Sequence, residues 1–183
     1  MAIAWILIIL AAAMVLGPVL LIQPSKGAAK TAKIRELAAL AGLRVSVLSK
    51  DDAKRDKNKD GLQSEARDYV EYSQRLPRTF EDIYQGDSCW SLTRCNYTHG
   101  LHFHSLWDWG GEARPNTRLE AALKTFIDQL PEGVSSLILR DDYCALHWNE
   151  VCIEQSPEDA VAGIQQLLVA FVSILTFTEG STT

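Results

Sequence analysis

The sequence lacks the short motifs that identify the commonest enzyme active sites. It contains no G-x-S-x-G nucleophile elbow, no P-loop and no glycine fingerprint for dinucleotide binding. Asp108 and Glu112 lie near His104 and could be drawn as an acid–base group, but one chain of this length contains many such groupings by chance. We therefore predict no catalytic residue and no cofactor, and we favour a protein that is not an enzyme.

The sequence also lacks the closely spaced C-x₂-C pairs that supply two ligands to many zinc sites. Its cysteines are Cys89, Cys95, Cys144 and Cys152. Histidines are denser in "HGLHFH", where His102 and His104 would share one face of a strand. Such a strand more commonly carries two polar side chains without a metal. We predict no metal site, and we retain His102, His104, Cys89 and Cys95 as the candidates.

Residues 2–22 contain no charged side chain. A helix of this length rises about 30 Å, which matches the hydrocarbon core of a bilayer. A cleaved signal peptide would instead have a basic segment, a shorter apolar core and a small-residue cleavage site. No Lys or Arg precedes this run, and the run is too long. We therefore predict an uncleaved transmembrane anchor over residues 2–23.

Only basic charges follow the apolar run until Glu36. They are Lys26, Lys30, Lys33 and Arg35. The positive-inside rule places this segment in the cytoplasm and the N-terminus outside. We also predict that these four side chains contact anionic lipid headgroups, at about 1 kcal/mol each. A cytoplasmic domain disfavours disulfides; with the opposite orientation, the even cysteine count would suit two bridges.

Charge divides the remaining chain into two parts. Residues 26–55 carry eight basic and three acidic side chains, whereas residues 56–183 carry ten basic and twenty acidic ones. Because phosphate binding needs a positive face, the acidic part is a poor candidate for binding nucleic acid. These acidic side chains are more simply interpreted as an ordinary solvated surface than as an acidic docking site.

Residues after the anchor show both helical and strand patterns. Good helix formers predict a basic juxtamembrane helix over residues 24–42, which Gly42 would stop. The strands are expected over residues 43–47, 68–76, 89–95 and 101–109, with a hairpin over 134–151. The segment 68–76 also has spacing compatible with a helix. Together these elements predict an α+β fold in which an antiparallel sheet carries helices mainly on one face. One cytoplasmic domain is expected over residues 43–178, followed by a tail over residues 179–183.

Two further helices have clear start signals. Asn116 or Thr117 can cap a helix that continues to about Leu130. Ser156 followed by Pro157 opens the last helix. Its apolar run is about half of what a second membrane span needs, so we predict a core helix there.

The stretch "DKNKDG", from Asp56 to Gly61, begins like the calcium loop of an EF-hand. In such a loop the twelfth position supplies a bidentate Glu, but here that position is Arg67. The preceding element is also a strand rather than a helix. We therefore predict a polar loop and no specific calcium binding.

The sequence "WDW" places Trp107 and Trp109 on one strand face and Asp108 on the other. Two tryptophans in a strand are most simply core residues. Trp is also enriched at binding hot spots, so they are the candidates for a contact with a partner.

The order of these features resembles an uncharacterised group of gammaproteobacterial single-pass inner-membrane proteins, some labelled YajC-like translocase subunits. The junction "VLLIQPSKGAAKTAKIRELA" is similar to that of YajC-type accessory proteins, but the small glycine-rich β-domain expected after it is not evident. The resemblance implies an inner-membrane accessory or scaffold protein with a cytoplasmic interaction domain, a membrane-protein partner and no catalytic residues. The alternative is a tethered metal sensor or enzyme that uses the His/Cys set.

Overall fold

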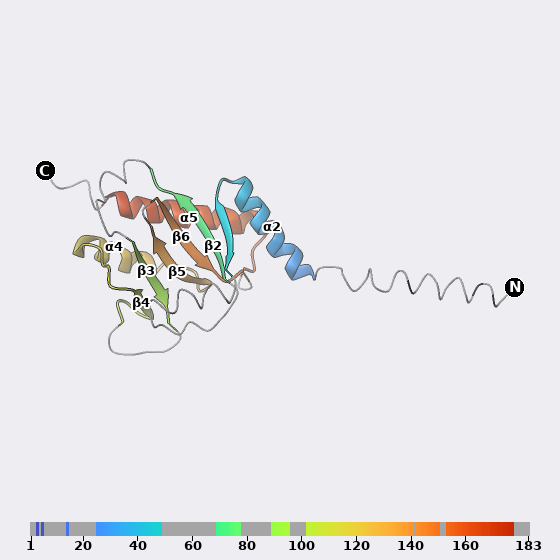
Figure 1. Cartoon of the computed structure of the whole chain (residues 1–183), viewed down its shortest axis with the longest axis horizontal. Helices are drawn as coiled ribbons and strands as arrows, with labels where there is room; N and C mark the ends of the chain where they lie inside the picture. Colours follow the sequence, from blue (N-terminus) through green and yellow to red (C-terminus); the bar gives the residue numbers. More distant parts are fainter. Residues whose placement is uncertain are drawn as a thin grey trace.

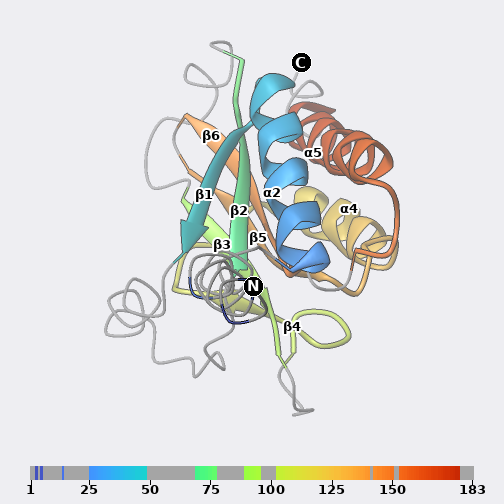
Figure 2. The same cartoon turned by 90° about the vertical axis from the view of Figure 1, so that its right-hand side faces the viewer.

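The computed structural model describes residues 25–48, 69–77, 89–95, 102–140, 142–150 and 153–177, together with positions 3, 5 and 14. A six-stranded antiparallel sheet has the order β1-β2-β6-β5-β3-β4. Helices α2, α4 and α5 lie on one face of it (Figures 1 and 2). The elements are α2 (Lys26–Leu40), β1 (Arg44–Leu48), β2 (Tyr69–Arg75), β3 (Trp90–Arg94), β4 (Trp107–Gly110), α4 (Thr117–Ile127), β5 (Val134–Leu139), β6 (Tyr143–Trp148) and α5 (Pro157–Phe177). The predicted α+β fold with an antiparallel sheet is confirmed.

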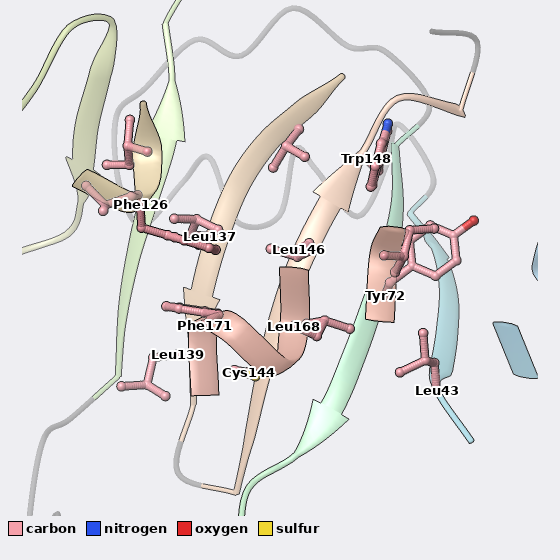
Figure 3. Packing of buried hydrophobic residues seen from close by; sticks show 14 of the residues in the cluster. Leu43, Tyr72, Phe126, Leu137, Leu139, Cys144, Leu146, Trp148, Leu168 and Phe171 are labelled. Carbon is pink, nitrogen blue, oxygen red and sulfur yellow. The ribbon is translucent and has the colours of Figure 1, made fainter. Parts of the chain in front are cut away.

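The helix-facing side of the sheet is apolar because buried residues align across the strands. Tyr72, Leu146, Leu137 and Leu92 occupy successive positions in the strand register, and all four are fully buried. Figure 3 shows Leu137, Leu146 and Tyr72 across neighbouring strands, with Phe171 of α5 close to the sheet. Antiparallel strands with one covered face show this alternation of apolar and polar residues.

A polar row crosses the other side of the sheet at the intervening positions. The register places Asp108, Thr93, Ser136, His147 and Glu71 next to one another on five strands. His147 Nε2 lies 3.2 Å from a Glu71 carboxylate oxygen. The hydrogen bond from His147 lowers the pKa of Glu71, and burial acts in the opposite direction. This face therefore carries paired polar groups rather than a second apolar core.

Helix α5 covers the middle of the sheet. Its inner stripe includes Ile164, Leu168 and Phe171, which are fully buried. In the described part of the chain, α5 is the one helix long and apolar enough to cross a membrane by length and composition. Its burial against the sheet makes it a core helix, as predicted. Most of residues 2–22 lie outside the described positions, but Ile3 and Trp5 are helical and exposed.

The predicted caps are present at two helix starts. The Asn116 side chain accepts a hydrogen bond from the Leu119 backbone N–H at 2.8 Å. The Ser156 hydroxyl accepts one from the Asp159 N–H at 3.2 Å. Each bond satisfies a backbone donor that the first helical turn leaves free. Gly42 follows α2 with φ 86°, a conformation that glycine adopts without strain.

Helix α2 is part of the domain core. Ile34 and Ala38 are fully buried, and α2 lies along α5 (Figure 2). The sequence suggested a juxtamembrane helix over residues 24–42 that was separate from a domain beginning at residue 43. The packing continues across that division, because the apolar side of the helix needs the rest of the domain to bury it.

The expected strand over residues 101–109 is interrupted. A tight turn occupies His104–Trp107, with backbone hydrogen bonds in both directions between these two residues, and Ser105 has φ 51°. Only β4 continues as a strand. Residues 102 and 103 lie outside any strand, and His102 contacts Asp108 whereas His104 contacts Asp128, so the prediction that the two histidines share a strand face is wrong. The turn that ends the segment has a non-glycine residue in the left-handed region, for which the sequence carries no signal.

Candidate functional site

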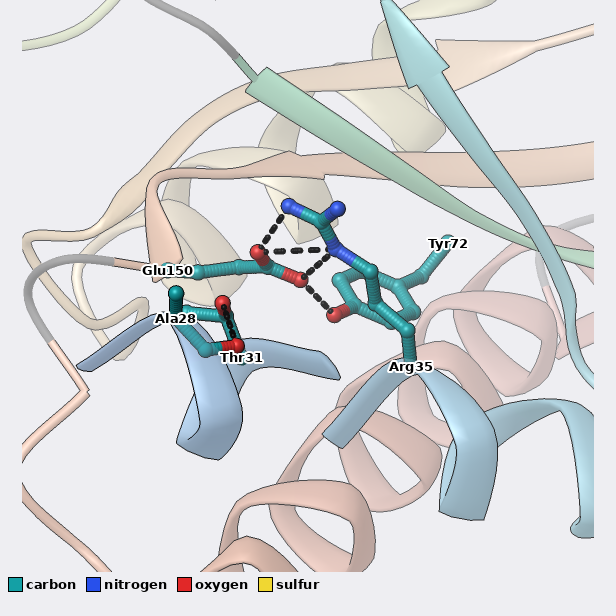
Figure 4. Close-up of polar contacts among 5 residues, drawn as sticks. All are labelled: Ala28, Thr31, Arg35, Tyr72 and Glu150. Atoms are coloured by element: carbon teal, nitrogen blue, oxygen red, sulfur yellow. Dashed lines mark hydrogen bonds and ion pairs between the residues drawn. The ribbon is translucent and has the colours of Figure 1, made fainter. Parts of the chain in front are cut away.

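An ion pair fastens α2 to the segment that follows β6. Arg35 donates from Nε to both carboxylate oxygens of Glu150 at 3.0 Å, and from Nη2 to Oε2 at 2.5 Å. Tyr72 in β2 donates its hydroxyl hydrogen to the same carboxylate (Figure 4). Three distant parts of the chain therefore meet at one buried acid. We call Arg35, Tyr72 and Glu150 the latch.

Electrostatics keep Arg35 charged and Tyr72 neutral in the latch. Hydrogen bonding to Glu150 raises the pKa of Arg35 although burial opposes this effect, and burial raises the pKa of Tyr72. The Glu150 side chain is only 5% exposed, and that of Arg35 is 37% exposed. Carboxylate–guanidinium pairs with two parallel hydrogen bonds are among the strongest polar contacts in proteins. Sequence reasoning missed Glu150 because its partner lies 115 residues away.

The predicted lipid-contacting residues mostly have partners within the protein. Arg35 belongs to the latch, and Lys30 donates to the Ile153 carbonyl at 2.9 Å. Lys33 pairs with Glu36 at 3.1 Å on the helix surface. Lys26 is exposed and forms no ion pair with any residue that the structure describes. The basic charges of α2 thus serve the fold more than the sequence suggested.

A second cluster joins Cys95, His102 and Asp108, and we call it the Cys95 cluster. Sγ of Cys95 lies 3.0 Å from Asp108 Oδ2, and His102 Nδ1 lies 2.8 Å from Asp108 Oδ1. The three ligand atoms all lie within 4.8 Å of one another. The side chains of His102 and Asp108 are 7% and 11% exposed. The cluster has the sulfur, nitrogen and oxygen donors of a metal site.

The arrangement does not resemble an activated cysteine nucleophile. In such a site the imidazole contacts the thiol and a third group orients the imidazole. Here the Asp108 carboxylate lies between Cys95 and His102. Burial, together with the hydrogen bond to Asp108, raises the pKa of the Cys95 thiol to about 12. Without a metal, Cys95 therefore remains a protonated donor to the carboxylate.

The other metal and acid–base candidates lie apart from this cluster. His104 contacts Asp128 at 2.8 Å rather than Asp108, so the acid–base group drawn around His104 is not assembled. Cys89 is half-buried ahead of β3, and Cys144 is buried in the core. The calcium-like loop and Cys152 lie outside the described residues. Asp108 was the residue that sequence reasoning failed to join to His102 and Cys95.

The two tryptophans of β4 have different environments. Trp107 is 3% exposed and belongs to the core. Trp109 is half-buried; its ring lies 4.6 Å from that of Phe103 and 5.2 Å from the Arg114 guanidinium carbon. We call Phe103, Trp109 and Arg114 the aromatic patch. Of the two partner-binding candidates, only Trp109 offers an accessible edge.

Comparison with known proteins gave no matching family model, no matching curated protein and no matching solved structure. The latch, the Cys95 cluster and the aromatic patch are therefore the features of the domain from which a function can be proposed.

Proposed function

We propose that the chain is a membrane-anchored accessory protein whose α+β domain lies at the cytoplasmic surface of a bacterial inner membrane and binds a membrane-protein partner. The observation that carries this proposal is the attachment of α2. This helix begins at Lys26, just after the uncharged run of residues 2–22, and the latch holds it in the domain. The YajC-like resemblance at this junction agrees with such a role.

A short connection would keep the domain close to the bilayer. Gln23 and Pro24 separate the apolar run from Ser25, the N-cap of α2. A fully extended chain spans at most about 3.6 Å per residue, so the three steps from Ile22 to Ser25 reach at most about 11 Å. Because α2 is rigidly packed, an anchor at its start would also restrict the orientation of the domain. A membrane-protein partner would then meet one defined side of the domain.

The aromatic patch is the candidate contact with that partner. Trp and Arg are the residue types most enriched at binding hot spots, and Trp109 lies beside Arg114. Trp109 also packs edge-on against Trp90, with ring centroids 5.4 Å apart, so its position is fixed before binding. Preorganised side chains lose less entropy on association.

Purification of the tagged full chain from native membranes in mild detergent tests this function. The wild-type protein should co-purify with a membrane-protein partner in a constant ratio. Trp109→Ala should weaken binding by about 30-fold, the effect of a 2 kcal/mol hot spot. Val169→Ala removes an exposed apolar side chain from α5 and serves as the matched control. Equal retention of the partner by both variants would contradict the patch as the binding surface.

A further inference from the structure

We propose that the Cys95 cluster is a binding site for zinc or a similar divalent transition-metal ion. This inference does not depend on membrane attachment or on the aromatic patch. It rests on three ligand types gathered in one largely buried place by the β3–β4 connection.

The sheet register explains why these side chains meet. Thr93 of β3 pairs with Asp108 of β4. Cys95 lies two residues after Thr93, and its backbone N–H donates to the Leu106 carbonyl at 2.7 Å. Cys95 therefore faces the side of the sheet that Asp108 faces. The turn at His104–Trp107 then returns the chain, so that His102 reaches the same carboxylate.

The donor set fits the chemistry of zinc. Zn²⁺ binds thiolate at about 2.3 Å, and imidazole nitrogen and carboxylate oxygen at about 2.0–2.2 Å, in tetrahedral geometry. These bond lengths place neighbouring ligand atoms roughly 3.3–3.7 Å apart. The observed contacts of 2.8 and 3.0 Å are hydrogen bonds to the two oxygens of Asp108, so these pairs would separate by about half an ångström. The ligand atoms all lie within 4.8 Å of one another, so the Cys95 sulfur and the His102 nitrogen would close by at most about 1 Å to share one ion. Such a shift lies within ordinary side-chain adjustment.

Charge also favours a cation at this place. Asp108 is buried, and its two carboxylate oxygens face Cys95 and His102, so a cation among these three groups would lie directly against a carboxylate removed from water. A divalent ion would balance the Asp108 carboxylate together with a Cys95 thiolate, leaving no net charge. Three protein ligands leave a fourth position for water or an exogenous group, which is the pattern of catalytic or sensing sites rather than of closed structural ones.

The chain provides matched controls for these ligands. His104 lies two residues after His102, but it contacts Asp128. Cys89 lies six residues before Cys95, at the other end of β3, and is half-buried. The variants His104→Gln and Cys89→Ser therefore remove the same chemical groups from the same region without removing a proposed ligand.

Cobalt titration of the metal-free full chain in detergent micelles tests the site directly. Co²⁺ is the probe because a cobalt–thiolate bond produces a charge-transfer absorption band. We expect one equivalent of Co²⁺ to bind with that band, and Zn²⁺ to abolish it by displacement. Cys95→Ser should lose the band. Asp108→Asn and His102→Gln should weaken binding by at least the roughly 10–100-fold that is typical for loss of an outer-shell partner. Both control variants should bind as the wild type does.

Two results would overturn the proposal. One is a wild-type chain, folded by circular dichroism, that gives no thiolate band at millimolar Co²⁺. The other is a band that survives in folded Cys95→Ser or disappears in folded Cys89→Ser. If Cys95→Ser does not fold, the wild-type titration and the His102→Gln variant still decide the question.

Discussion

Removal of Arg35 from the latch is expected to destabilise the domain far more than removal of another cation from the same helix. The variant Arg35→Met keeps most of the apolar stem and deletes the charge. It leaves the Glu150 carboxylate, which is 5% exposed, with the Tyr72 hydroxyl as its one remaining donor within the latch. Breaking a buried ion pair from one side costs about 3–5 kcal/mol.

Partial exposure reduces this figure. Because 37% of the Arg35 side chain is exposed, water can reach the vacated position, and we expect a loss of about 2–4 kcal/mol. Single domains unfold with about 5–15 kcal/mol, so the loss is a large share of the total. The matched variant Lys33→Met breaks a pair with Glu36 whose side chains are 47% and 59% exposed. Exposed pairs of this kind contribute about 0–1 kcal/mol.

Urea unfolding of residues 25–183, followed by circular dichroism, measures both variants. With a slope of about 1–3 kcal/mol per molar, a 3 kcal/mol loss moves the midpoint by roughly 1–3 M. Glu150→Gln should cost less, about 1–2 kcal/mol, because the amide oxygen still accepts from Tyr72 and Arg35 can turn to water. The reasoning is refuted if Arg35→Met costs no more than Lys33→Met.

Three further predictions concern the core, the polar loop and a close backbone approach. Trp107→Ala should lower the free energy of unfolding by about 3–5 kcal/mol and Trp109→Ala by clearly less, as urea titrations would show; equal losses would contradict the surface position of Trp109. Calorimetry should detect no Ca²⁺ binding tighter than about millimolar, and micromolar binding lost in Asp56→Ala would refute this. Gly133→Ala should lower the free energy of unfolding by about 1–3 kcal/mol, because a Cβ there would lie 2.4 Å from Trp148 Nε1. An unchanged melting temperature would contradict this close contact between the Gly133 backbone and the Trp148 ring.

The sequence predicted the elements that depend on local pattern. Alternating apolar residues identified the strands, and Asn116 and Ser156 marked helix starts through side-chain hydrogen bonds to nearby backbone donors. The short apolar run of α5 likewise predicted that this helix packs in the core, and its inner side chains are buried. These signals lie within a few residues of the feature they specify, so one chain is enough to read them.

Contacts between distant segments were not predictable in the same way. The latch joins Arg35 to Glu150, and nothing near either residue indicates the other. The Cys95 cluster depends on the register of β3 against β4 and on a turn in which Ser105, not glycine, adopts a positive φ. Candidate ligands were therefore identifiable by residue type, whereas their true partners required the fold.

Residues 2–22 are proposed to anchor the domain on the cytoplasmic side of the membrane. Paired reporters fused after Thr183 test it most directly, with one reporter active only in the cytoplasm and the other only in the periplasm. The account predicts activity of the cytoplasmic reporter in the membrane fraction and silence of the periplasmic one. The opposite pattern, or a cytoplasmic reporter recovered in the soluble fraction, would contradict it.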